Sequence, residues 1–339
     1  MRNLFVVRLT AAGVILGCAS TARAQIYEDV GTRAQGMGGA FVAVADDATA
    51  SWWNPAGLAT GKLGSVVVER GRTADPAKPG ATGPARRDGA SGFSMAFPAL
   101  AVSYYRLRIS EIAPVSSTGT NPLDREDLGA ADVHLQSRAV SQYGMTVGQS
   151  LGTHLVLGST LKLLRAGTAE SSVVGGEDLL DRADDLEVSG DTKTDLDAGA
   201  MAALGRARFG LTVKHLRAPA FGDGDDRFVM KRQARAGIAF LTQSQGAIDG
   251  LAVAADMDLT RTATVRGDVR RFAAGVELWL AKRRLGLRSG LNLNTIDRAD
   301  PTGSVGISVG DSSFLLDAAL LFGSDQARNG LNVGFSLTF

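Results

Sequence analysis

The sequence predicts an all-β fold: a transmembrane antiparallel β-barrel of about 14 strands, with an N-terminal hatch plugging the lumen. Three observations lead to this prediction. Apolar and polar residues alternate strictly in the strand candidates, short and long loops alternate along the chain, and an export signal occupies the amino terminus. A secreted soluble β protein is the alternative, because soluble sandwiches also contain alternating strands.

Residues 1–24 have the layout of a secretory signal peptide. Arg2 supplies positive charge, an apolar stretch covers residues 9–17, and Ala22 and Ala24 form a small-residue cleavage site. The mature chain would begin at Gln25, and the loss of three arginines would take the formal charge from +1 to about −2. This balance argues against nucleic-acid binding, which requires a clustered basic surface.

Cys18 is the only cysteine, and it lies inside the signal. The mature chain would therefore have no disulfide, catalytic thiol or cysteine metal site. An alternative is that Cys18 is acylated at a lipoprotein processing site, although Leu16 fits that pattern poorly. No later segment offers about 20 continuous apolar residues, so no transmembrane helix is predicted.

The segment that follows, 25–61, is predicted to form a hatch. It does not alternate with period two, it is rich in glycine and turn residues, and it is too small to bury a core alone. It therefore needs a surface to pack against, and a wide lumen provides one. Glycine permits close backbone approach, and Asp and Asn can bond backbone amides. The residues expected to shape the hatch are Gly36, Gly38, Gly39, Asp46, Asp47, Asn54, Pro55 and Ala56.

The barrel is predicted to occupy residues 62–339. An even number of candidates is typical of bacterial single-chain barrels. The strand candidates are 62–72, 91–97, 100–109, 133–149, 153–166, 193–204, 207–217, 229–242, 247–262, 267–281, 284–294, 302–309, 312–322 and 330–339.

The connections between these candidates alternate in length. Tight turns such as 205–206 and 282–283 alternate with longer loops such as 110–132 and 167–192. Outer-membrane barrels have short periplasmic turns and longer external loops, whereas a soluble sandwich has no reason to sort its loops in this way.

The two faces of each candidate strand differ in polarity. A charged side chain on the lipid face costs about 2–4 kcal/mol at mid-bilayer, so charged residues should face the lumen. They could form a polar network that simply fills the barrel, or they could line a path. The predicted lumen-facing residues are Lys162, Lys214, Arg235, Asp256, Asp258, Arg271, Glu277, Arg288 and Asp317.

The last strand candidate ends on an aromatic residue. Phe335, Leu337 and Phe339 lie on its apolar face, and we expect them to act as the carboxy-terminal signal read by the barrel-assembly machinery.

The order of motifs after the signal resembles the hatch of FadL-type outer-membrane barrels. The matching runs are 33–41, 45–48 and 53–58, and they are most similar to the PorV-like branch, which includes proteins labelled conjugal-transfer TraF-like. The resemblance implies a monomer in the outer membrane of a Gram-negative-type envelope, plugged by its own hatch. In transporting members the hatch obstructs the lumen and hydrophobic ligands leave sideways. By position, Asn54, Pro55 and Ala56 would be the hatch motif, which could contact ligand or simply fix the plug.

The external loops differ from those of fatty-acid transporters. Residues 170–191 carry eight acidic residues against one arginine, which suits a protein partner or the hydrated surface better than a fatty acid. Three functions stay open: a gated channel for small hydrophobic molecules, a PorV-like adaptor that binds secreted or secretion-system proteins, and a closed structural barrel. The expected partners are outer-membrane lipid, the assembly machinery, and a hydrophobic small molecule or a secreted protein.

No enzyme activity and no cofactor are expected, because no Ser/His/Asp pattern or nucleotide loop stands out. His134, His154 and His215 lack metal-ligand spacing. The run of Asp223, Asp225 and Asp226 resembles a fragment of a calcium loop without its final glutamate.

Overall fold

The computed structural model describes residues 30–60, 64–75, 85–114, 132–174, 178–222, 227–264, 267–296, 299–311, 313–323 and 329–339. The predicted signal peptide, its Cys18 and the acidic run at 223–226 lie outside these residues.

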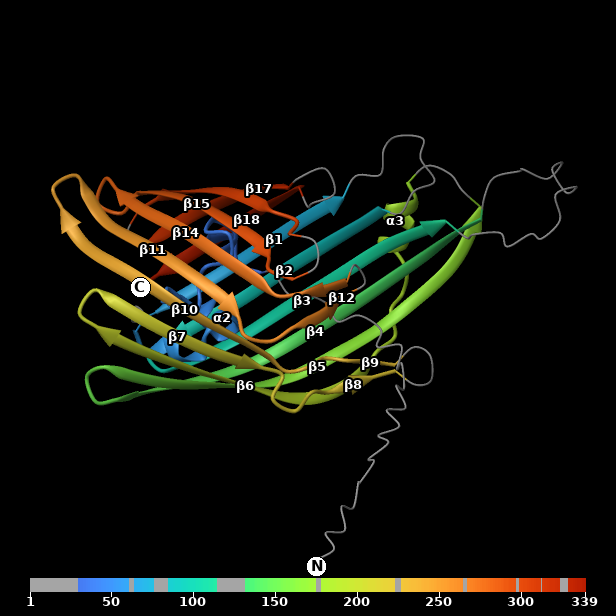
Figure 1. Cartoon of the computed structure of the whole chain (residues 1–339), viewed down its shortest axis with the longest axis horizontal. Coiled ribbons are helices and arrows are strands. Elements are labelled where there is room, and N and C mark those ends of the chain that lie inside the picture. The colour runs from blue at the N-terminus through green and yellow to red at the C-terminus, as the bar shows by residue number, and fades with distance from the viewer. Residues whose placement is uncertain are drawn as a thin grey trace, which may run out of the picture.

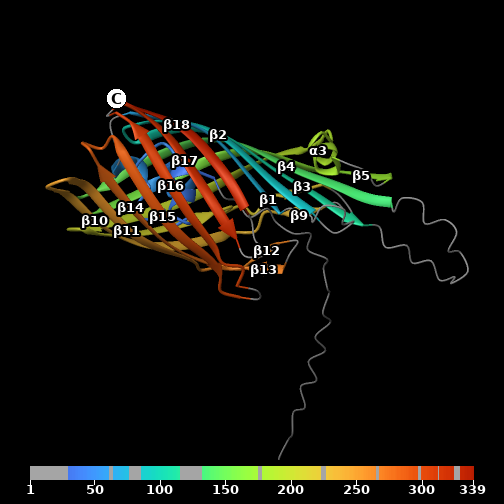
Figure 2. The ribbon, with the colours of Figure 1, turned by 90° about the horizontal axis from the view of Figure 1, so that it is seen from above.

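The described chain forms one closed antiparallel barrel (Figures 1 and 2). Each strand pairs with its neighbour along the chain, and the first pairs with the last. Its fourteen strands are β1 (Ser65–Asp75), β2 (Ala85–Phe97), β3 (Leu100–Pro114), β4 (Asp132–Leu151), β5 (Leu155–Val174), β6 (Asp191–Leu204), β7 (Ala207–Lys214), β10 (Gln233–Gln245), β11 (Ile248–Asp258), β14 (Arg271–Leu280), β15 (Leu285–Asn294), β16 (Thr302–Gly310), β17 (Phe314–Gly323) and β18 (Asn329–Thr338). The predicted barrel is confirmed, and every strand candidate overlaps one of these strands.

The boundaries differ from the prediction mainly at the end with the longer loops. β2 begins at Ala85, and β3 and β5 continue to Pro114 and Val174. Strands β3–β5 therefore reach well beyond the rest of the barrel (Figure 1). Two further hairpins occur in the connections: β8 (Ala220–Phe221) with β9 (Phe228–Val229), and β12 (Thr262–Thr264) with β13 (Gly267–Val269).

The helical elements are short. They are α1 (Thr32–Gly36), α2 (Ala50–Trp53), the 3₁₀ helix η1 (Pro55–Thr60) and α3 (Leu179–Asp184). Across the described ranges, no helix combines the length and the apolar character needed to cross a membrane.

The outside of the barrel carries an apolar band, as the alternation predicts. Large apolar side chains are exposed on every strand of the wall except β14, for example Val147 on β4, Leu161 on β5 and Leu316 on β17. Exposure of this many apolar side chains is unfavourable in water and is the normal state of a barrel in lipid.

The segment 30–60 lies inside this barrel, so the lumen is filled rather than open. Nearly all of its side chains are buried, including Phe41, Trp52 and Asn54. The strands meet it through a ring of glycines, where an added Cβ would contact or overlap hatch atoms. A Cβ at Gly158 would overlap the Pro55 backbone. The glycine ring consists of Gly158, Gly199, Gly210, Gly237, Gly275, Gly290, Gly306 and Gly334.

Candidate functional site: the hatch and the lumen wall around it

Arg33 of α1 forms ion pairs with two other residues of the hatch and with one residue of the barrel wall. Its guanidinium contacts Asp46 and Asp47 of the hatch at 2.5 and 2.9 Å, and both oxygens of Glu277 on β14 at 2.7 and 2.6 Å. Burial opposes the charge of Arg33, but the nearby Asp46 and Glu277 carboxylates outweigh it and raise the guanidinium pKa above its usual value.

Glu277 also belongs to a second set of ion pairs within the wall. Arg288 of β15 donates from Nε to Glu277 at 2.8 Å and from Nη1 to Asp317 of β17 at 3.1 Å. Three of the residues predicted to face the lumen therefore form one chain of charges that ends on Arg33. Since removing one partner of a buried pair leaves an uncompensated charge, this chain fixes the position of α1.

Two wall carboxylates bond backbone amides of the hatch. Asp256 of β11 accepts hydrogen bonds from the amides of Phe41 and Val42 at 2.7 and 2.8 Å, and Glu69 of β1 accepts one from Thr32 at 2.8 Å. Buried amides need such partners because water cannot reach them. The hatch is thus tied to opposite sides of the barrel.

Asn54 supports the turn into η1. Its side-chain amide donates to the carbonyls of Val42 at 2.9 Å and Ala200 of β6 at 3.1 Å, and its oxygen accepts from the amide of Ala56 at 3.1 Å. Asn54 is completely buried. Together with Pro55, it joins two hatch segments to the wall at one point.

The glycines and acidic residues predicted to shape the hatch have distinct positions. Gly38 and Gly39 have φ of 67° and 84°, where a side chain would be strained, while Gly36 lies against Gly306. Asp47 also accepts from the amide of Thr49 at 2.9 Å.

Aromatic residues form the surface of the hatch toward the long loops. Trp52 packs on Tyr105 of β3 with ring centroids 4.7 Å apart, and the Lys214 ammonium lies 3.7 Å from the Trp52 ring. The Arg235 guanidinium lies 5.5 Å from the Trp53 ring and pairs with Asp258 at 2.6 Å. Cations over aromatic faces gain attraction from the ring quadrupole.

A buried charge cluster lies on the wall formed by β5, β6 and the residue after β7. The Lys162 ammonium is 3.1 Å from Asp195 and 2.6 Å from Asp197, and the His215 Nδ1 is 2.7 Å from Asp195. The Asp195, Asp197 and His215 ligand atoms lie close enough together for a metal ion. The lysine already supplies a cation between the two carboxylates, in the place that a metal ion would take.

Sequence reasoning missed this cluster and the role of Arg33. His215 is distant in sequence from Asp195 and Lys162, and neighbouring strands bring them together. Arg271 lies on β14, and its amide donates to Asp258 at 2.9 Å. Phe335, Leu337 and Phe339 lie on β18 and just after it, and the Phe339 ring packs against Phe97 of β2.

Cavities flank the hatch within the described part of the barrel, and two of them are larger than a single water site. One of about 30 Å³ lies between Trp52, Trp53 and the Lys214–Arg235 side. The other, of about 340 Å³, lies at the end with the short turns and is lined by Arg33, Asp46 and Trp279 among others. A single water-sized site needs roughly 10–15 Å³, so the first cavity holds little more than water.

A family model described as "F plasmid transfer operon, TraF, protein" matches residues 82–258, more than half of the chain. The chain belongs to this TraF family. No curated protein matches the sequence.

Solved structures share the fold of this TraF-family chain at low sequence identity. The toluene transporter TodX of Pseudomonas putida has a TM-score of 0.60 at 11% identity, covering 93% of this chain and 99% of its own. The toluene transporter TbuX of Ralstonia pickettii has a TM-score of 0.55 at 14% identity, covering 91% and 98%. The CymD monoaromatic hydrocarbon channel has a TM-score of 0.58 at 11% identity, covering 91% and 97%.

These findings confirm the resemblance to FadL-type barrels and the TraF-like label. The TraF-family chain has the all-β barrel fold of these transport channels. The shared fold and the apolar outer band agree with the predicted location in the outer membrane.

Proposed function

We propose that this protein is a gated outer-membrane channel for small hydrophobic molecules, with residues 25–61 as the hatch, 62–339 as the barrel and 1–24 as the signal peptide. The observation that carries the proposal is an apolar inner wall above the hatch. Leu107, Ile109 and Val140 belong to the same buried apolar cluster as Trp52 of the hatch and Phe228 of the β8–β9 hairpin. A hydrophobic molecule that had passed the charged entrance, where Arg86 pairs with Asp88 and Glu111, would meet apolar side chains next to the hatch.

The contacts of the hatch are suited to a gate because all of those described are noncovalent. Arg33, Asp256 and Asn54 hold it through ion pairs and hydrogen bonds. The geometry corresponds to the closed state, so transport requires the hatch to shift. The lumen-facing charged residues would then hold the hatch against the wall in the closed state, and they would not bind the solute.

A second candidate function, a PorV-like adaptor that binds secreted or secretion-system proteins, is favoured by one observation. The described barrel strands form a closed series of pairs, and the register shift found among them lies between Ile248 and Gly250, next to a short turn. A wall without a lateral opening is what a barrel that transports no small molecule would have. The acidic segment around α3 also suits the binding of a protein partner.

A disulfide lock tests the channel. An added Cβ at Gly334 would lie 3.3 Å from the Cβ of Thr32, close to the separation of about 3.5–4.5 Å in disulfides. The Thr32→Cys/Gly334→Cys variant should therefore fasten α1 to β18 when oxidised. Uptake of radiolabelled toluene into proteoliposomes would be measured before and after reduction, with both single-cysteine variants as controls.

Toluene uptake that is blocked by oxidation and restored by reduction would support the gate. Equal uptake in both redox states would contradict it. No uptake by any variant, together with a stoichiometric protein partner recovered from native outer membrane, would favour the adaptor.

A further inference from the structure

The outer face of strands β1–β5 changes from apolar to cationic side chains at one position along the strands. The register places one outward residue of each strand in a single row, made of apolar and aromatic side chains. Tyr104 and Tyr143 lie side by side in this row, with ring centroids 4.8 Å apart. Aromatic girdles mark the lipid–water interface of outer-membrane barrels. The row consists of Val68, Phe93, Tyr104, Tyr143 and Leu163.

The next outward positions, toward the long loops, carry arginines instead. Across the five strands, the paired residues of the first such row are alternately arginine and serine. The second row contains two more arginines among glycine and alanine. We call these the arginine rows: Arg70, Ser91, Arg106, Ser141 and Arg165, then Arg72, Gly89, Arg108, Ala139 and Gly167.

At the same position along the strands, the inner face changes from polar to apolar side chains. Leu107 and Ile109 of β3 alternate with Arg106 and Arg108, and they are buried inside the barrel. Directly beyond the tyrosines the wall is therefore cationic outside and apolar inside, before the charged inner residues Asp88 and Arg138. This pattern is expected for a part of the sheet that projects out of the bilayer.

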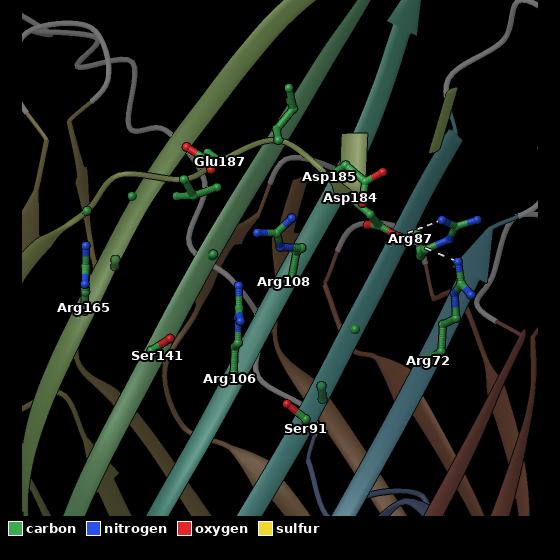
Figure 3. Close-up of a pocket in the computed structure, with 18 of the residues that line it drawn as sticks. Arg72, Arg87, Ser91, Arg106, Arg108, Ser141, Arg165, Asp184, Asp185 and Glu187 are labelled. Carbon is green, nitrogen blue, oxygen red and sulfur yellow. Dashed lines mark hydrogen bonds and ion pairs between the residues drawn. The ribbon is translucent and has the colours of Figure 1, made fainter. Parts of the chain in front are cut away.

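A strap of chain, residues 178–190 with α3, crosses outside the arginine rows (Figure 3). Ala183 and Leu179 of the strap pack on Val133 and Leu135, at the far ends of the long strands. Between the strap and the wall lies an open cavity of about 1330 Å³. The floor of this cavity is formed by the arginine rows, and Tyr143 lies at its edge toward the lipid.

The strap brings four carboxylates to the cavity, Asp181, Asp184, Asp185 and Glu187, against the arginines of the wall, and ion pairs are formed by two of them. Asp181 and Asp184 pair with Arg87 at 2.6 and 2.7 Å and lie 3.5 and 3.7 Å from Arg72. In the described part of the chain, the other four arginines have no ion pair: Arg70, Arg106, Arg108 and Arg165.

The spacing of the rows leaves room for ligands between the arginines. Adjacent strands lie about 4.8 Å apart, so arginines on alternate strands are roughly 10 Å apart, with a small residue between them. Ser91 and Ser141 occupy these intermediate positions. Guanidinium groups bind phosphate in a bidentate manner, and hydroxyl groups can donate to the same oxygens.

We propose that the arginine rows bind the phosphate groups of lipids in the outer leaflet of the outer membrane. The rows begin immediately above the aromatic girdle, which is the depth of lipid headgroups. A lipid seated there would place its acyl chains on the apolar band below and its phosphates among Arg70, Arg106 and Arg165. Basic side chains next to a membrane surface attract anionic headgroups.

The test is lipid retention measured by native mass spectrometry. Purified full-length barrel in mild detergent is incubated with bisphosphorylated lipid A, or with phosphatidylcholine as a zwitterionic lipid. The variant Arg70→Gln/Arg106→Gln/Arg165→Gln removes three charges from the rows. The control Arg206→Gln/Lys282→Gln/Arg284→Gln removes three charges from the short turns at the opposite end. Heat-dependent gel migration shows whether each barrel is folded.

We expect the wild type and the control to retain lipid A, and the triple variant to retain at least about ten-fold less, since each arginine contributes to headgroup attraction. A second variant with lysine at the same three positions should recover part of the retention, because the charge remains but bidentate binding is lost. Equal retention by wild type and the glutamine variant would overturn the proposal. Release of lipid A by millimolar pyrophosphate, together with pyrophosphate binding in the absence of lipid, would assign the rows to soluble phosphates instead.

Discussion

Arg33 and Glu277 form a two-point contact between the hatch and the wall, with the Arg33 Nε and Nη2 atoms 2.7 and 2.6 Å from the two carboxylate oxygens. Bidentate pairs of this kind fix orientation as well as distance. The same carboxylate also holds Arg288, so the position of α1 depends on the ion pairs of β14 and β15.

We expect Glu277→Gln to loosen the hatch without opening the barrel. The substitution leaves two arginines facing a neutral amide, and removal of one partner of a buried pair costs about 3–5 kcal/mol. Hydrogen exchange of amides 32–60 should accelerate while exchange in β4 and β5 stays slow. Asp249→Asn, at a short turn, provides a control with the same loss of charge, and unchanged exchange in Glu277→Gln would contradict the prediction.

Alanine at Gly158 should displace the hatch, because an added Cβ there would overlap the Pro55 backbone. Gly89→Ala is the matched control, since a Cβ at that position meets nothing within 4 Å. We expect limited proteolysis to cleave the hatch in Gly158→Ala and to spare it in Gly89→Ala. Overpacking of this kind costs about 1–3 kcal/mol. Equal resistance of the two variants would show that the hatch has room to adjust.

The substitution Asn54→Asp should destabilise the closed state more than Asn54→Ala. The aspartate keeps the shape of the side chain but loses the two amide hydrogens donated to Val42 and Ala200, and it places a negative charge beside their carbonyls. Alanine leaves those carbonyls unpaired, at about 1–3 kcal/mol. Thermal unfolding in detergent should rank wild type above Asn54→Ala and Asn54→Ala above Asn54→Asp, and the reverse order of the two variants would contradict this account.

The strap should stay docked from neutral pH down into the acidic range. Hydrogen bonding from Arg87 is the main cause that lowers the pKa of Asp181. A carboxyl group with a lowered folded-state pKa stabilises the docked strap above its unfolded pKa of about 3.9, and this stabilisation is lost as pH falls through the folded value. Hydrogen exchange of residues 178–190 should therefore accelerate only below about pH 4. Asp181→Asn should lack this acid transition, and a transition near neutral pH would contradict the assignment.

Removal of Lys162 should create a metal site at a cost in stability. Lys162→Ala leaves Asp195 and Asp197 as buried carboxylates without their cation, which costs about 3–5 kcal/mol. Zn²⁺ can bind carboxylate and imidazole ligands, so it should recover part of the lost thermal stability in this variant and have no effect on the wild type. His215→Ala in the Lys162→Ala background should abolish the recovery, and recovery without the histidine would exclude this site.

The barrel could be predicted from the sequence because the residue pattern that produces it is present within each strand. Lipid on one side and a polar lumen on the other impose period-two alternation, and loop length reports the side of the membrane. Both signals are visible in any single strand, which is why all fourteen candidates correspond to strands. The long ends of β3 and β5 were missed because above the tyrosines the alternation continues with its faces exchanged.

The contacts of the lumen could be predicted only in part. The rule that charges avoid lipid selects Glu277, Arg288 and Lys162, but it does not say which charge each one meets. Arg33 meets Glu277 across more than two hundred residues, and this pairing depends on how deep the hatch lies. That depth depends on the glycine ring, whose members look individually like ordinary strand glycines.

The hatch lies against the place where the barrel closes. Thr32 lies against both Glu69 of β1 and Gly334 of β18, the two strands whose pairing closes the cylinder. In the folded protein the seam therefore encloses the hatch, and both of its strands contact the same hatch residue. Under the proposed gating, contacts that join the hatch to the closing strands would also have to release it during transport.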